Sequence, residues 1–375
     1  MYAISLLQGM VFYAPVATLY RQARGLSVFH ITLIESLSFV VMILLEIPWG
    51  YVADKIGYKK VMTICCFLYF ISKLVFLRAD GFIWFLSERI LLGVVCAGLS
   101  GVDSAMLYES TDKENSQKVF GVYSALSRAG LLIAAGAFAL FIKDDFWLSA
   151  FATTISYLSA AILSLFLKEV KLKEKEREKT SIKYAFATLK QTFANSKLLL
   201  LVLSTALFSQ TCQTLTVFLN QPKYVATGLD TTMISVAYIF VTLSGVCSAF
   251  SYLFTKKIGT KNFGIILLTS AIFSCGGIAF SGSGFLCIVF MVVLAISWSM
   301  FEPVQIQIQN TEIKSENRAT VLSINSALMS LLAVFTNVIF GKTADVNINY
   351  AFLLGAGFCA AGLVLYILSF LKRKI

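Results

Sequence analysis

The chain has 375 residues, of which 58% are hydrophobic and 14% charged, and its formal net charge is +11. A soluble domain is usually about 45–50% apolar and about 25% charged, so this composition excludes an ordinary soluble globular protein. The basic residues lie between apolar blocks, which indicates a topology signal rather than a nucleic-acid-binding surface. The blocks are continuous rather than alternating, which excludes a β-barrel, so we expect an all-α membrane protein.

Twelve apolar blocks follow one another along the chain, and each is long enough to predict a membrane-spanning helix. The expected spans are residues 2–20, 27–50, 60–78, 82–108, 118–141, 146–167, 198–220, 230–254, 262–281, 284–309, 318–341 and 348–371. The first block is expected to be the first span and not a signal peptide.

One connection is long, polar and basic. Residues 168–197 predict a solvated helix or linker followed by an amphipathic helix on the membrane surface. We therefore expect an N-terminal six-helix bundle over 1–167, a cytoplasmic linker over 168–197 and a C-terminal six-helix bundle over 198–375.

The positions of Lys and Arg predict the orientation of the chain. With the loop at 51–60 placed inside, 22 basic residues lie on the cytoplasmic side and six on the far side, among them Arg21 and Lys223. Three more, at positions 73, 89 and 128, fall inside spans. We expect a multi-pass protein of the cell (plasma or inner) membrane with both termini in the cytoplasm.

The two halves repeat at a fixed offset of 202 residues, with no gap. Lys55-Ile56-Gly57 recurs as Lys257-Ile258-Gly259, and Ser124-Ala125-Leu126 recurs as Ser326-Ala327-Leu328. Each match falls at the same place in its six-span unit, which favours an internal duplication over coincidence. Two parallel six-span halves are a known transporter architecture, with the substrate site between them near mid-membrane.

A motif after the second span resembles that of a known family. The segment GYVADKIGYKK resembles the G-x-x-x-D-x-x-G-[RK]-[RK] loop of the major facilitator superfamily; its matching residues are Gly50, Asp54, Gly57, Lys59 and Lys60, while Tyr58 stands where a basic residue is common. A degenerate copy (YLFTKKIGTK, 252–261), SERILLG (87–93) and RATVLS (318–323) extend the resemblance over the chain. It implies about 12 helices in two pseudo-symmetric six-helix bundles.

Each residue of this loop motif has an expected structural role. Gly57 is expected to take a positive φ and end a helix, and Gly50 to let a neighbouring helix approach closely. The resemblance implies that Asp54 faces the N-terminus of span 11 near Arg318, and that Glu109 joins this latch on the cytoplasmic side. Lys59 and Lys60 are expected to anchor span 3 and to meet anionic lipid.

Ionisable residues inside spans are costly and indicate function. Depth in the membrane predicts two pairs, Glu35 with Arg89 and Asp103 with Arg128, as candidates for proton coupling. A buried carboxylate that loses its cationic partner favours the protonated form, so such a pair can carry a proton. Static structural ion pairs are the alternative. The resemblance implies a role for Arg89 in proton movement. Lys73 is expected to extend outward to the membrane surface.

Polar residues also gather on the spans where the resemblance places a substrate cavity. The candidates are Tyr13, Gln210, Gln213, Thr214, Trp298, Glu302, Gln305 and Asn325. Hydrogen bonding between helices is the alternative for each of them. The single histidine, His30, is expected in a short loop, and the eight cysteines show no metal-type spacing, so no metal site and no cofactor are expected.

The family resemblance, together with the buried charges, implies a proton-coupled secondary carrier that exports small amphiphilic or drug-like compounds, acting as a monomer in the lipid bilayer. Its partners would be a small-molecule substrate and protons, with no nucleic acid. An importer of a nutrient or metabolite on the same fold is the alternative. Residues 127–138 of span 5 contain glycines but no proline, which departs from the drug/proton antiporters. A membrane enzyme would need a catalytic cluster, and an ATP-driven pump would need a phosphate-binding loop. The sequence shows neither pattern. A permease subunit that works with a separate ATPase remains an open alternative.

Overall fold

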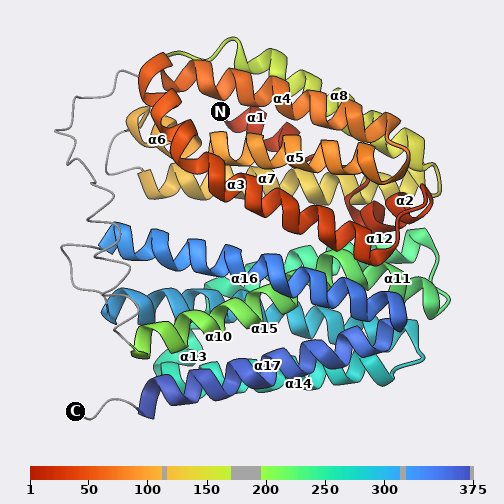
Figure 1. The fold of residues 1–375 in the computed structure, drawn as a ribbon, viewed down its shortest axis with the longest axis vertical. Helices are drawn as coiled ribbons and strands as arrows, with labels where there is room; N and C mark the ends of the chain where they lie inside the picture. Colours follow the sequence, from red (N-terminus) through yellow and green to blue (C-terminus); the bar gives the residue numbers. More distant parts are fainter. Residues whose placement is uncertain (112–115, 170–195, 313–317, 372–375) are drawn as a thin grey trace. The chain divides into compact units, whose positions relative to one another are not determined.

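The computed structural model describes residues 1–111, 116–169, 196–312 and 318–371, and the regular elements in these ranges are all helical (Figure 1). Twelve helices, or runs of consecutive helices, are long and apolar enough to cross a membrane. This confirms the twelve predicted spans. Apolar side chains such as Phe141 and Phe280 are more than four-fifths exposed, as expected for a surface that faces lipid.

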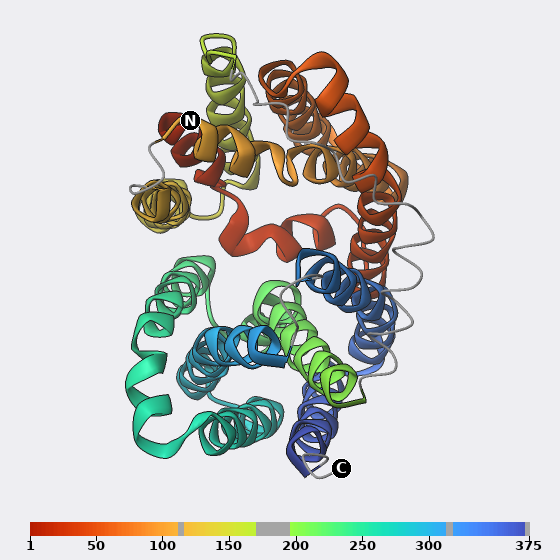
Figure 2. The same cartoon turned by 90° about the vertical axis from the view of Figure 1, so that its left-hand side faces the viewer.

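The chain divides into two compact units, each described here by itself. The first comprises Met1–Lys175 and Asp230–Ile239, and the second comprises Glu176–Leu229 and Phe240–Ile375. Figure 2 views several helices of the first unit nearly end-on.

In its described residues the first unit has ten helical elements before the central connection. They are α1 (Tyr2–Gly9), η1 (Ala14–Val16), α2 (Ala17–Gln22), α3 (Val28–Ile56), α4 (Tyr58–Arg78), α5 (Gly81–Leu99), α6 (Val102–Glu109), α7 (Ser116–Ala137), η3 (Phe138–Ile142) and α8 (Phe146–Ser164). Within the unit α3 and α4 pack on α5, α8 packs on α4, and α1 packs on α7.

The remaining elements follow the central connection. They are α10 (Ser196–Gln213), η4 (Thr214–Leu219), α11 (Asn220–Ala226), α12 (Thr231–Leu243), η5 (Ser244–Phe250), α13 (Ser251–Ile258), α14 (Thr260–Phe280), α15 (Gly284–Glu312), α16 (Arg318–Val346) and α17 (Ile348–Leu371). In the second unit α17 packs along both α10 and α14, and α15 packs on α14. The first part of α12 is grouped with the first unit.

The structure differs from the predicted spans at several points. Span 1 is broken between α1 and η1, and span 4 is broken at Gly101, whose φ is +82°. The segment expected as a loop at 51–60 is helical except at Gly57, because α3 continues to Ile56. His30 lies in the first turn of α3 rather than in a loop. Its backbone N–H donates to Ser27 Oγ (3.2 Å), and its Nδ1 accepts from Ser27 N–H (3.4 Å), so the histidine side chain completes a helix cap.

Gly57 and Gly259 give the repeat a structural counterpart. Gly57 joins α3 to α4 with φ +96° and ψ 149°, and Gly259 joins α13 to α14 with φ +80° and ψ 154°. Each glycine N–H donates to the carbonyl four residues earlier, at 3.0 and 2.9 Å, and both following helices have 21 residues. The predicted positive φ at Gly57 is therefore confirmed. Gly50, by contrast, is exposed, and a Cβ there would meet no described atom within 4 Å, so its role in close helix packing stays a prediction.

Helices α1 and α7 of the first unit approach each other closely at two glycines. A Cβ on Gly9 would lie 2.1 Å from the carbonyl oxygen of Ser127, and a Cβ on Gly130 would lie 2.3 Å from that of Leu6. The Ser5 hydroxyl also donates to the carbonyl of Tyr123 across this contact, at 2.8 Å. The two backbones touch, and only glycine fits at these positions.

This crossing predicts that Gly130→Ala destabilises the protein by about 1–3 kcal/mol, because the added methyl group overpacks a contact made of backbone. Gly136→Ala, in the same helix, is the matched control, since a Cβ there meets nothing within 4 Å. We expect that control to be neutral or slightly stabilising. Thermal unfolding of both purified variants in detergent measures the difference, and equal unfolding midpoints would contradict the close crossing.

Candidate functional site

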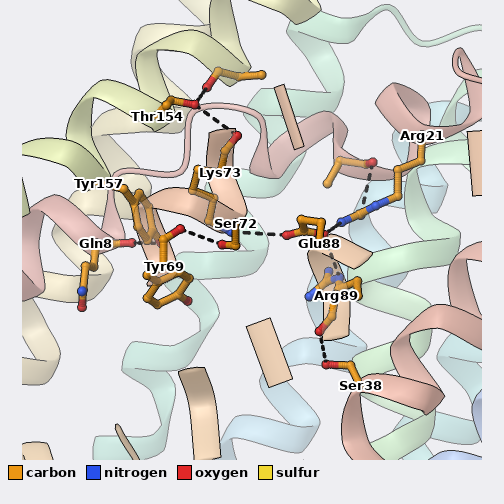
Figure 3. Close-up of polar contacts among 12 residues, drawn as sticks. Gln8, Arg21, Ser38, Tyr69, Ser72, Lys73, Glu88, Arg89, Thr154 and Tyr157 are labelled. Carbon is orange, nitrogen blue, oxygen red and sulfur yellow. Dashed lines mark hydrogen bonds and ion pairs between the residues drawn. The ribbon is translucent and has the colours of Figure 1, made fainter. Parts of the chain in front are cut away.

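Five ionisable side chains of the first unit form a buried cluster. Figure 3 shows four of them, Arg21, Lys73, Glu88 and Arg89. They come from four helices: Arg21 from α2, Glu35 from α3, Lys73 from α4, and Glu88 and Arg89 from α5. We call this set the ion cluster. Three of its members are cationic and two are acidic.

Glu88 lies at the centre of the ion cluster. Its carboxylate oxygens lie 3.7 Å from Arg21 NH2, 3.7 Å from Lys73 Nζ and 3.8 Å from Arg89 Nε. The Glu88 side chain is 1% exposed, and neither oxygen has a hydrogen-bond partner among the described residues. These distances exceed the roughly 2.7–2.9 Å of a charge-assisted hydrogen bond. Glu88 is therefore shared electrostatically by three cations without being bound closely by any of them.

Glu35 and Arg89 form the more accessible edge of the ion cluster. Arg89 NH1 lies 3.3 Å from Glu35 Oε2, and the two side chains are 18% and 12% exposed. This pair was predicted from depth in the membrane, and its geometry is confirmed. The α3–α5 contact fixes it, since Ser38 Oγ donates to the Arg89 carbonyl at 2.8 Å and a Cβ on Gly93 would lie 2.7 Å from the Ser38 carbonyl oxygen.

Lys73 points into the bundle and is 5% exposed, so the prediction that it extends outward is wrong. Its ammonium lies 5.8, 5.1 and 5.2 Å from the ring centroids of Tyr13, Tyr69 and Tyr157. Three aromatic faces at this range stabilise a cation. The rings are held in place in turn, because Tyr157 OH donates to the carbonyl of Gln8 at 2.5 Å. Tyr13, predicted as a substrate-cavity residue, thus lies beside the ion cluster.

Arg21 was expected in a loop between the first two spans, and that placement is wrong. It lies in α2, 2% exposed, with its guanidinium carbon 5.1 Å from the ring of Phe76 and 5.8 Å from that of Phe85. Its NH1 donates to the carbonyl of Ala17 at 3.5 Å, and its Nε is buried with no partner among the described residues. The break in span 1 explains the error, because it turns the short α2 into the bundle.

Glu88 was not identified from the sequence. The signal was available, because Glu88 immediately precedes Arg89 in an apolar block, where any ionisable residue is costly. Adjacent helical residues point about 100° apart, so Glu88 and Arg89 contact different neighbours from one helix.

The second predicted ion pair does not form. Among the residues that the structure describes, no ion pair within 4.0 Å joins Asp103 to Arg128. Asp103 accepts from the backbone N–H of Ser104 at 2.6 Å in the first turn of α6, and Arg128 is exposed on α7. Equal depth on sequential spans did not determine which way each side chain faces.

The motif residues lie at the α3–α4 corner. Tyr58 OH donates to Asp54 Oδ1 at 3.2 Å, so the tyrosine that replaces the usual basic residue still contacts this carboxylate. Glu169 Oε1 accepts from the Lys59 backbone N–H at 3.1 Å, at the start of α4. Lys60 is exposed. The side chains of Glu109 and Arg318 lie outside the described residues, as does most of the predicted amphipathic segment of the linker, so the predicted latch stays a prediction.

The second unit holds most of the predicted cavity residues. Asn325 Nδ2 donates to Gln309 Oε1 at 3.1 Å, and Gln309 Nε2 contacts Gln305 Oε1. Thr214 Oγ1 donates to Asn337 Oδ1 at 2.8 Å.

The other predicted cavity residues make different contacts. Gln210 is buried, and its Oε1 has no partner in the described part of the chain. Trp298 packs edge-on against Phe208 at 5.4 Å, Gln213 is half-buried and Glu302 is exposed on α15.

Two further features are a buried lysine in the second unit and the arrangement of possible metal ligands in the described ranges. Lys223, expected on the far side of the membrane, is 4% exposed in α11, and its ammonium donates to the Ser281 carbonyl (3.0 Å) and to Asn349 Oδ1 (2.7 Å). In the described ranges no group of three or more His, Cys, Asp or Glu side chains is placed to hold a metal ion.

The ion cluster predicts that Glu88→Gln destabilises the protein by about 3 kcal/mol or more, because three buried cations would then share one carboxylate. Glu46→Gln is the matched control, since Glu46 lies on the same unit but is exposed on α3. We expect the control to change stability by less than about 1 kcal/mol. Thermal unfolding in detergent measures both variants, and a Glu88→Gln protein as stable as the parent would show that the ion cluster does not depend on this carboxylate.

Comparison with known proteins agrees with the architecture. The sequence model of the Major Facilitator Superfamily matches residues 1–336. The chain is 23% identical to multidrug resistance protein 2 of Bacillus subtilis (strain 168) over 331 residues, which covers 86% of this chain and 81% of that protein.

Solved structures share the fold. The nucleoside transporter NupG aligns with a TM-score of 0.83 at 16% identity, covering 100% of this chain and 98% of that one. A D-xylose–proton symporter aligns with a TM-score of 0.71 at 16% identity, covering 96% and 95%. The twelve spans, the repeated glycine corners and the family match lead to one conclusion: the chain belongs to the Major Facilitator Superfamily and is a multi-pass membrane transporter rather than an enzyme.

Proposed function

We propose that this transporter is a proton-coupled secondary carrier that moves a small solute by alternating access. The observation that carries the proposal is the ion cluster, and within it the Glu35–Arg89 pair. Five ionisable side chains in a membrane-spanning unit are costly to bury, and such groups commonly form proton or ion pathways. A rearrangement that separates Glu35 from Arg89 would favour protonation of the carboxylate.

Of the two carboxylates, Glu35 is the better proton carrier. Glu88 faces three cations, each of which favours its ionised form, and it is 1% exposed. Glu35 has one cationic partner within 4.0 Å among the described residues and is 12% exposed, so a proton can reach it more easily. Glu88 is then the fixed counter-charge that keeps the three cations in place. Asp103 and Arg128, which do not pair, are weaker candidates for the same role.

Efflux of amphiphilic or drug-like compounds is the first candidate direction. Its support is the likeness to a multidrug resistance protein at 23% identity. In this account the polar set of the second unit, including Gln210, Gln305 and Asn325, contributes to solute binding. The Asp54 motif contributes to closure on the cytoplasmic side, with Glu109 and Arg318.

Import of a nutrient or metabolite is the second candidate, and one observation favours it. The ion cluster holds three cations and two carboxylates, a balance that suits an anionic solute better than the cationic compounds of many efflux systems. For either direction we place the protein as a monomer in the cell membrane, with both termini in the cytoplasm. The proposed organisation is one six-helix bundle over 1–167, a linker over 168–197 and a second bundle over 198–375.

The proposal predicts that Glu35→Gln loses solute flux driven by a pH gradient but keeps gradient-independent exchange, because the neutral amide cannot bind and release a proton. Purified protein in liposomes is tested with an imposed pH gradient, with ethidium efflux and radiolabelled benzoate uptake as the two arms. Glu46→Gln is the control with flux like the parent protein. Ethidium efflux by the parent protein would indicate export, and benzoate uptake would indicate import. If Glu35→Gln kept gradient-driven flux, Glu35 would not be the proton carrier.

A further inference from the structure

The ion cluster contains more positive than negative charge, and this excess indicates a binding site for an anion. We propose that Arg21 and Arg89 form a binding site for an anionic group, a carboxylate or a phosphate, on the transported solute. This inference deepens the proposed function and rests on it only in taking the bound anion to be the carrier's solute.

The cluster holds one more positive than negative charge when all five groups are ionised. Both guanidiniums stay charged in any protein setting. The Lys73 ammonium lies among three tyrosine faces and 3.7 Å from Glu88, both of which favour its charged form. An excess buried charge is costly in a membrane-spanning unit, and an anion from solution would neutralise it.

The surrounding groups do not supply that anion. The titratable neighbours of the cluster among the described residues include Tyr13 from the α1–η1 connection, Tyr20 from α2, Tyr69 from α4, Tyr157 from α8 and Cys96 from α5, and none of these is an Asp or a Glu. Arg24, in the turn that follows α2, adds another cation. It is held apart by its bond to the Ala79 carbonyl at 2.7 Å.

The two guanidiniums have unused hydrogen-bonding capacity. Arg21 Nε has no acceptor in the described chain, and its NH1 makes a long bond of 3.5 Å to Ala17. Both arginines lie 3.7–3.8 Å from the same carboxylate, without the bidentate contact that guanidinium and carboxylate groups favour. Arg89 is 18% exposed, so one end of the pair can be reached from outside the packed unit. Guanidinium pairs with free donors suit planar carboxylates and phosphates.

Proton and anion would then bind together. Protonation of Glu35 removes one of the two negative charges and leaves Arg89 without its 3.3 Å partner, which raises the excess positive charge from one to two. Binding of the proton therefore strengthens binding of the anion, and the anion strengthens binding of the proton to the same degree. Ligands that bind cooperatively on one carrier move together. The anion site thus favours proton-linked import over proton-exchange efflux.

Equilibrium binding to the full-length protein, purified in a non-ionic detergent, tests the site without depending on transport. Four probes of similar size are compared at fixed ionic strength: benzoate, phenyl phosphate, benzylammonium and benzyl alcohol. We expect benzoate, phenyl phosphate or both to raise the thermal unfolding midpoint with saturation, and the cationic and neutral probes to leave it unchanged. The stronger of the two anions distinguishes a carboxylate from a phosphate solute.

Variants locate the site. Arg21→Gln brings the cluster to zero net charge and should weaken the apparent affinity for the anion at least about tenfold. Arg24→Gln, the matched control in the turn just after α2, should leave that affinity unchanged. Arg21→Lys keeps the positive charge and serves as the test if Arg21→Gln does not fold. It should still bind the anion, but with a lower affinity than the parent protein. Glu35→Gln should bind the anion more tightly than the parent at neutral pH and lose the pH dependence.

Three results would overturn the anion site. Neither benzoate nor phenyl phosphate would raise the unfolding midpoint, or benzyl alcohol would raise it as much as benzoate does, or Arg21→Gln would bind the anion with the affinity of the parent protein. The flux measurement of Glu35→Gln remains separate. Binding that persists without gradient-driven flux would preserve the site and remove proton coupling, whereas coupled flux without anion binding would remove the site and leave the coupling.

Discussion

The packing of the first unit depends on a carboxylate that is buried among three cations. Burying an ion costs several kcal/mol even after the protein relaxes, and this cost is offset only where opposite charges are close. Glu88 provides that compensation for Arg21 and Lys73, and in part for Arg89, at 3.7–3.8 Å. Because these cations come from α2, α4 and α5, one side chain links three helices. None of these distances is as short as a charge-assisted hydrogen bond of roughly 2.7–2.9 Å.

The surrounding structure can be understood as support for that arrangement. The tyrosine rings around Lys73 and the phenylalanine rings around Arg21 stabilise cations without adding negative charge. The Gly93–Ser38 contact holds α3 against α5, so that Glu35 reaches Arg89. The ion cluster therefore has aromatic rings around Lys73 and Arg21, and the partly exposed Glu35–Arg89 pair lies at its edge.

Much of the fold could be predicted from the sequence, because lipid imposes a simple length rule and the chain repeats itself. The apolar blocks predicted all twelve spans, and the offset of 202 predicted that Gly57 and Gly259 occupy equivalent corners. The site was harder to predict. Depth along the membrane identified the Glu35–Arg89 pair, but it also suggested Asp103 with Arg128, which do not meet. Depth fixes one coordinate, whereas pairing also depends on the rotation of each helix. Breaks within spans, such as the one that turns Arg21 inward, depend on packing that a block of apolar residues does not reveal.

The central claim is that the ion cluster couples a proton to an anionic solute, and proton counting during binding tests it most directly. Benzoate is added to the purified protein in a weakly buffered solution near neutral pH, and a pH indicator records protons taken up or released. The account predicts proton uptake by the parent protein as benzoate saturates the site, and no uptake by Glu35→Gln, which cannot be protonated there. Proton release on binding, or equal uptake by both proteins, would contradict the account.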